Sequence, residues 1–154
     1  MELGSIEREI YIEASPEVVF EVISTPQHLR QWWPDDVSIE PVPGATGRLV
    51  FGDPDDPEAK VAPMTVVEVD PPHRFSFRWI HGEDEEAAEG NSLLVTFDLV
   101  PTGAGTTLHL TEVGFREMGW EIAVLEATYQ DHVNGWNHYV PRLPAYVDRL
   151  VANR

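Results

Sequence analysis

The sequence contains no cysteine. This absence excludes disulfide bonds, zinc sites built on thiolates and thiol nucleophiles together. No stretch approaches the roughly 20 consecutive apolar residues that a membrane-spanning helix needs. The segment Met1 to Glu9 lacks the basic start and the apolar run of a signal peptide. We therefore expect a cytoplasmic protein with no part in the membrane.

Basic residues are also scarce. The chain has 27 Asp and Glu against 10 Lys and Arg, which gives a formal net charge of −17, and Lys60 is its single lysine. A field of this sign repels phosphate backbones and anionic lipid surfaces, so we expect no nucleic-acid partner and no membrane partner. The sequence has no His-x-x-x-His pair, nucleophile elbow, phosphate loop or dinucleotide fingerprint. We therefore expect no metal site and no cofactor.

The length of 154 residues fits one domain, covering residues 1–154. Its first part reads as a strand followed by two short helices. Ser5 to Glu13 alternates apolar and charged residues, which is typical of a half-buried strand. Ser15 and Pro16 then provide an N-cap and a first helical residue. A second short helix is predicted over Gln27 to Trp32, ended by Pro34.

The central part of the chain changes to a strand pattern. Short runs of alternating apolar residues are separated by turn residues such as Thr102-Gly103-Ala104-Gly105. This part predicts an antiparallel sheet, with strands over Val37 to Glu40, Gly47 to Phe51, Val61 to Val69, Arg74 to Ile80, Asn91 to Val100 and Thr106 to Val113.

The C-terminal part predicts one long helix. Apolar residues recur at steps of three and four from about Tyr129 to Val151. Pro141 and Pro144 interrupt this pattern, and a proline inside a helix removes a hydrogen bond and bends the helix. We expect a kink near Tyr139 to Arg142, or two helical pieces.

The order of these elements resembles the START-like superfamily, which includes the birch-pollen allergen and the polyketide cyclases. Five segments resemble the branch named after the activator of the 90-kDa heat-shock protein ATPase, and they cover nearly the whole chain: Ile10 to Phe20, Leu29 to Pro34, Val69 to Trp79, Gly105 to Phe115, and Gly135-Trp136.

The resemblance implies an α+β helix-grip fold. In it, a curved antiparallel sheet of about six or seven strands wraps around a long, kinked C-terminal helix, and two short helices follow the first strand. It also implies an apolar cavity between sheet and helix. Catalytic residues vary so widely in this superfamily that none transfers to this chain by membership alone.

Large aromatic residues are the main candidates for the cavity wall. The chain has five tryptophans, and each indole N–H group needs a hydrogen-bond partner if it is buried in a solid core. Ordinary core packing could explain each aromatic by itself, whereas several together favour a wall that stacks on a flat ligand. The candidate ligand-binding residues are Trp32, Trp33, Phe51, Met64, Phe75, Phe77, Trp79, Phe97, Leu110, Glu112, Trp120, Trp136, His138 and Tyr139.

Glu112 is the best polar candidate. By alternation it shares a strand face with Leu108 and Leu110, so its carboxylate should point inward. There it could act as an acid or base, or anchor a ligand hydroxyl. The alternative is a structural pairing with Arg116 or with the backbone.

Three functions remain open from the sequence. The first is binding of a small apolar or aromatic molecule. The second is a polyketide cyclase-like, dehydratase-like or hydrolase-like enzyme, with Glu112 and His138 or Tyr139 handling protons. The third is a co-chaperone-like protein-interaction domain, which requires an exposed apolar patch. The chain could act as a monomer or as a homodimer.

Overall fold

The computed structural model describes residues 4–82 and 84–152, and its centre is one antiparallel sheet. The spatial order of the strands is β1-β7-β6-β5-β4-β3-β2, so the first strand lies beside the last. The predicted strands are confirmed to within about two residues. Their bounds are β1 Ser5–Ile12, β2 Asp36–Ser38, β3 Thr46–Phe51, β4 Lys60–Asp70, β5 Arg74–Trp79, β6 Leu93–Thr102 and β7 Gly105–Val113.

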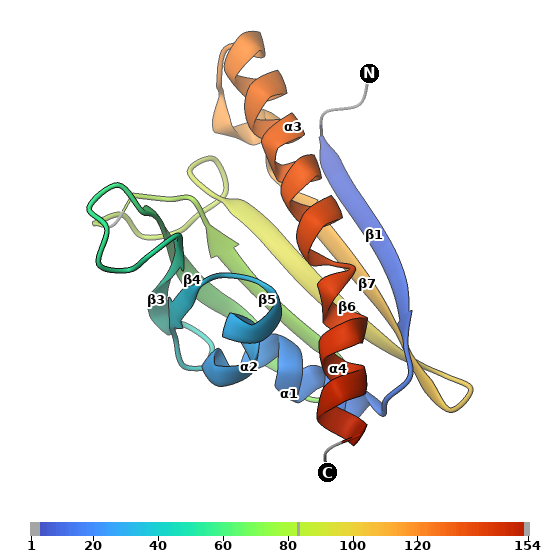
Figure 1. Ribbon diagram of the computed structural model, residues 1–154. Coiled ribbons are helices and arrows are strands. Elements are labelled where there is room, and N and C mark those ends of the chain that lie inside the picture. The colour runs from blue at the N-terminus through green and yellow to red at the C-terminus, as the bar shows by residue number, and fades with distance from the viewer. Residues whose placement is uncertain (1–3, 83, 153–154) are drawn as a thin grey trace.

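Helices cover one face of this curved sheet (Figure 1). The side chain of Ser15 accepts a hydrogen bond from the Val18 N–H, which caps the first helix as its sequence predicts. The two short helices lie at one end of the sheet, and the C-terminal helices run across it. The bounds are α1 Pro16–Ser24, α2 Pro26–Trp32, the 3-10 turn η1 Arg116–Met118, α3 Ile122–Tyr139 and α4 Arg142–Ala152. The fold is the helix grip.

The C-terminal helix bends where its prolines predict. Helix α3 ends at Tyr139 and α4 begins at Arg142, so Pro141 lies in the break. Pro144 falls in the first turn of α4, where its missing N–H costs no helical hydrogen bond. The predicted start at Tyr129 is wrong, because α3 begins at Ile122. The first turns of α3 show no stripe of apolar residues at helical spacing in the sequence, because most of their side chains are exposed.

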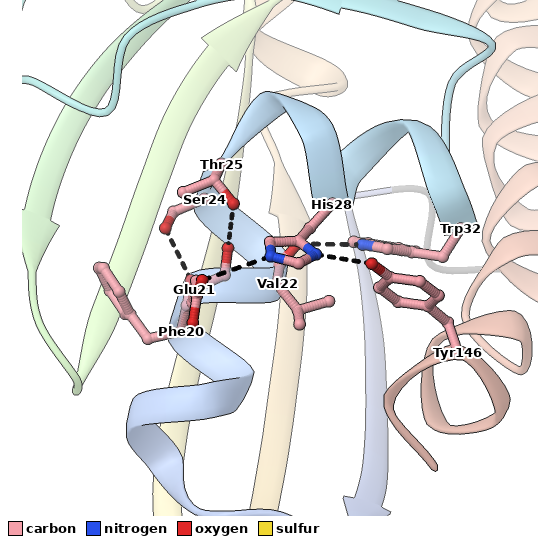
Figure 2. Close-up of polar contacts among 8 residues, drawn as sticks. All are labelled: Phe20, Glu21, Val22, Ser24, Thr25, His28, Trp32 and Tyr146. Carbon is pink, nitrogen blue, oxygen red and sulfur yellow. Dashed lines mark hydrogen bonds and ion pairs between the residues drawn. The ribbon is translucent and has the colours of Figure 1, made fainter. Parts of the chain in front are cut away.

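Polar contacts connect α4 to the two short helices (Figure 2). Nδ1 of His28 lies 2.6 Å from the hydroxyl of Tyr146, and Nε2 of His28 lies 3.4 Å from a carboxylate oxygen of Glu21. Beside them, the indole N–H of Trp32 donates to the carbonyl oxygen of Val22 at 3.2 Å. These contacts hold α1, α2 and α4 together at one end of the core.

Buried side chains form the core at this end of the fold. It lies between the inner face of the sheet and the helices, and its largest buried side chains are aromatic. None of the helices in residues 4–82 and 84–152 combines the length and the hydropathy of a membrane span. The central core residues are Trp32, Met64, Phe75, Phe77, Phe97 and Leu110, each at most 1% exposed.

Candidate functional site: an aromatic pocket beside a buried carboxylate

Glu112 points into the protein near the end of β7, as the strand alternation predicts, and is 0% exposed. Two tryptophans from other elements donate to it. The indole N–H of Trp79 on β5 lies 2.7 Å from Oε2, and that of Trp136 on α3 lies 2.8 Å from Oε1. Each carboxylate oxygen therefore accepts one indole hydrogen bond, which partly offsets the cost of burying the charge. The alternative pairing with Arg116 is wrong.

His132 is the third partner of this carboxylate. Its Nδ1 lies 2.9 Å from Oε2 and 3.0 Å from Oε1 of Glu112. His132 precedes Trp136 by one helical turn, so both side chains reach the same carboxylate from one face of α3. Because both oxygens already accept indole protons, an ionised carboxylate with the imidazole proton on Nδ1 satisfies all three contacts. The lone pair of the imidazole then lies on Nε2.

A pocket of about 350 Å³ opens to solvent beside this cluster. It lies between the second half of α3 and strands β3, β4 and β5. Lys60 and Asp131, whose charged groups are 3.5 Å apart, form an ion pair at its exposed side. The aromatic part of the wall consists of Trp33, Phe51, Trp79, Trp136 and Tyr139.

Trp33 is the centre of the aromatic wall. Its ring centroid lies 5.1 Å from that of Trp136, 5.3 Å from that of Trp79 and 6.2 Å from that of Phe51. These separations are typical of favourable aromatic pairs. Because Trp79 and Trp136 direct their N–H groups at Glu112, the surface that they leave for the pocket is apolar. The buried carboxylate thus orients two of the rings.

His132, Trp33 and Tyr139 add polar groups to the pocket wall, which also contains Lys60, Asp131, Asn134 and His138. All buried side-chain nitrogen and oxygen atoms of the described residues have a hydrogen-bond partner. Nε2 of His132 and Nε1 of Trp33 have no partner among those residues, so both atoms must reach accessible space. Burial, with a contribution from Asp35, raises the pKa of the Tyr139 phenol above 10. Tyr139 is therefore a neutral O–H donor at neutral pH.

Two unusual backbone positions, Gly135 and Ile80, lie on the pocket wall. Gly135 lies within α3 on the pocket wall, and a Cβ added there would meet no atom within 4 Å. A glycine inside a helix costs about 1 kcal/mol relative to alanine. Ile80, which follows Trp79 on the wall, has φ of 72°, a value that β-branched residues rarely adopt. Such strain costs about 1–3 kcal/mol and is commonest at functional sites.

The structure brings six of the fourteen candidate residues to the pocket: Trp33, Phe51, Trp79, Trp136, His138 and Tyr139. Glu112 lies behind the wall, and Trp120 is half-buried away from the pocket. Six others fill the core: Trp32, Met64, Phe75, Phe77, Phe97 and Leu110.

The pocket also contains His132 and Gly135, which were not among the ligand-binding residues predicted from the sequence. The available signal was the spacing of His132 and Trp136, which places the two on one face of a helix. In residues 4–82 and 84–152, no three His, Asp or Glu side chains gather in a way that could hold a metal ion.

Comparison with known structures finds the same fold in several bacterial proteins. Protein MLL2253 from Mesorhizobium loti is 20% identical, with a TM-score of 0.75 over 94% of this chain and 97% of its own. Protein NE0264 from Nitrosomonas europaea is 15% identical, with a TM-score of 0.78 over 99% of each chain. DynU16, a putative protein in the dynemicin biosynthetic locus, is 23% identical, with a TM-score of 0.69 over 94% of this chain and 47% of its own.

Comparison with curated proteins finds no match. The model of one protein family, described as activator of Hsp90 ATPase homolog 1-like protein, matches residues 13–148. This match covers most of the chain and agrees with the helix-grip fold and with the resemblance of the five sequence segments. The chain belongs to the family described as activator of Hsp90 ATPase homolog 1-like protein.

Proposed function

We propose that this protein binds a small, flat, apolar or aromatic molecule in the pocket between α3 and the sheet. The observation that carries the proposal is the pocket wall, in which five aromatic side chains surround a space of about 350 Å³. This volume falls in the usual range for small-molecule sites, and such sites combine apolar walls with a few placed polar groups. Here His132, Trp33 and Tyr139 provide those polar groups.

Several features of the pocket wall lower the stability of the fold, and this supports a functional role for the pocket. Two tryptophans are held by a carboxylate with no solvent contact, a glycine stands inside a helix beside open space, and Ile80 adopts a strained backbone. A fold selected only for stability would fill this space with aliphatic side chains. The related fold of DynU16, which belongs to a biosynthetic locus, is compatible with a small-molecule ligand.

Gly135→Leu tests the proposal by filling the pocket. The Cβ of the new side chain meets no atom within 4 Å, Gly135 lines the pocket, and leucine favours the helix more than glycine, so we expect the variant to fold. We expect N-phenyl-1-naphthylamine, a neutral apolar dye, to bind the parent at one per chain. We expect its fluorescence enhancement to be lost in Gly135→Leu, with affinity reduced by about tenfold or more.

Ala127→Leu is the matched control for this experiment. Ala127 is exposed on the same helix and lies outside the pocket lining. The control should bind the dye as the parent does, and thermal unfolding of all three proteins should show that each is folded. Equal dye binding by the parent and Gly135→Leu, or no binding by the parent, would contradict a ligand site in this pocket.

A second candidate function is a cyclase-like enzyme, and one observation favours it. The carboxylate–imidazole pair of Glu112 and His132 is an arrangement used in general acid–base catalysis. Glu112 itself cannot reach a ligand, because three donors occupy its oxygens and the wall covers it.

The cytoplasmic location, the oligomeric state and a co-chaperone-like interaction stay predictions.

A further inference from the structure

We propose that Nε2 of His132 is a general base that removes an acidic proton from a ligand in the aromatic pocket. The substrate class that fits is an aromatic 1,3-dicarbonyl or the related enol. The proposal rests on the proposed function, since the base can act only on a molecule that the pocket holds.

The geometry of His132 carries this proposal. The side chain is 7% exposed, Nδ1 is held by both oxygens of Glu112, and the rings of Trp79 and Phe115 contact the imidazole at centroid distances of 5.3 and 5.6 Å. The imidazole is therefore fixed in orientation, and in its neutral form a proton on Nδ1 is the arrangement that suits the carboxylate. The hydrogen bonds of the ring within the described residues all involve Nδ1, and because no buried polar atom there lacks a partner, Nε2 must reach accessible space.

Glu112 acts through His132 as a positioning residue. A buried carboxylate on Nδ1 keeps the proton on that atom, so Nε2 keeps its lone pair, and it stabilises the imidazolium that forms when Nε2 accepts a proton. The indole N–H groups of Trp79 and Trp136 hold the carboxylate itself in place. A histidine without such a partner would share its proton between the two nitrogens.

The proposed step balances without any external reagent. The C–H bond between the two carbonyl groups breaks, its proton forms an N–H bond at Nε2, and the electron pair moves to a carbonyl oxygen as an enolate. The Trp33 indole and the Tyr139 phenol lie on the wall without an acceptor in the part of the chain that the structure describes, and both are donors of the type that stabilises an enolate oxygen. The imidazolium then returns the proton to the oxygen, which gives the enol, or to the carbon.

The choice of substrate follows from the wall and the base together. Five aromatic side chains select a flat conjugated molecule, whereas an unpaired imidazole nitrogen requires a donor or an acidic hydrogen on that molecule. The hydrogens between two carbonyl groups are among the most acidic C–H groups, so an imidazole can remove them. An aryl 1,3-diketone meets both requirements.

The test uses 1-phenylbutane-1,3-dione as the probe. Its enol absorbs ultraviolet light more strongly than its keto form, so the approach to tautomeric equilibrium after dilution into buffer can be followed by absorbance. Quenching of tryptophan fluorescence measures binding of the same probe. We expect the parent to accelerate tautomerisation and His132→Gln to lower the protein-dependent rate by about 100-fold or more, with binding retained.

His73→Gln is the control, because His73 is an exposed histidine outside the pocket and should leave the rate unchanged. Nitrogen-15 NMR of the histidines in the parent protein provides a readout that does not require a folded variant. It should show His132 with its proton on Nδ1 and none on Nε2.

Each remaining outcome separates the two proposals. Binding of the diketone without acceleration, an unchanged rate in His132→Gln, or a proton found on Nε2 would overturn the catalytic inference and leave the binding proposal standing. If neither the diketone nor N-phenyl-1-naphthylamine binds, the proposed function fails, and the inference that rests on it fails with it.

Discussion

Replacing Glu112 by alanine is expected to lower the free energy of unfolding by about 3–5 kcal/mol, because one partner of a buried charged cluster is removed. The substitution leaves the N–H groups of Trp79 and Trp136 and Nδ1 of His132 without an acceptor. An unsatisfied buried donor costs about 1–3 kcal/mol, and the lost side chain also leaves a cavity.

Urea denaturation followed by circular dichroism measures this loss. Glu126→Ala is the matched control, since Glu126 is an exposed glutamate on α3 and should change stability by less than about 0.5 kcal/mol. If Glu112→Ala lost no more than this control, the carboxylate would not be the centre of the hydrogen-bonded cluster.

Trp32→Ala is expected to cost about 3–5 kcal/mol of unfolding free energy, the usual loss when a large aromatic residue is deleted from a core. Trp32 is 0% exposed, its ring stacks on Trp33 at 6.0 Å, and it meets Phe97 edge-on at 6.3 Å. Its indole N–H also donates to the Val22 carbonyl at the junction of the short helices. The substitution therefore removes packing and a buried hydrogen bond together.

The control for Trp32→Ala is Trp120→Ala, which removes an indole that is half-buried outside the pocket. We expect this change to cost clearly less, because part of that side chain is already in water. Chemical denaturation of both variants and the parent gives the comparison. Equal losses would mean that Trp32 does not belong to the solid core and that the boundary between core and pocket is misplaced.

Much of the fold could be predicted from local patterns. Alternation predicted the strands and the inward direction of Glu112, and Ser15-Pro16 marked the start of the first helix. Pro141 marked the break in the C-terminal helix. These features depend on neighbouring residues along the chain, which the sequence displays directly. The early start of α3 was missed because its first turns face solvent and carry no apolar period.

The candidate site could be predicted only in part, because it depends on how distant elements meet. Alternation places Phe77 and Trp79 on the same face of β5, yet the first fills the core and the second lines the pocket. The two residues differ in their position along β5, and only Trp79 lies where the strand and α3 enclose the pocket. The role of His132 likewise depends on the rotation of α3 against β7, which long-range packing decides and local sequence does not.

The indole N–H signals of the five tryptophans provide the most direct test of a ligand pocket at this wall. A ¹H–¹⁵N spectrum of the protein should show separate signals from Trp79 and Trp136, which bond to Glu112, and from Trp33, whose indole has no acceptor among residues 4–82 and 84–152. On titration with N-phenyl-1-naphthylamine, we expect large shifts for these three signals and small shifts for Trp32 and Trp120. Shifts confined to Trp120, or none at all at dye saturation, would contradict this expectation.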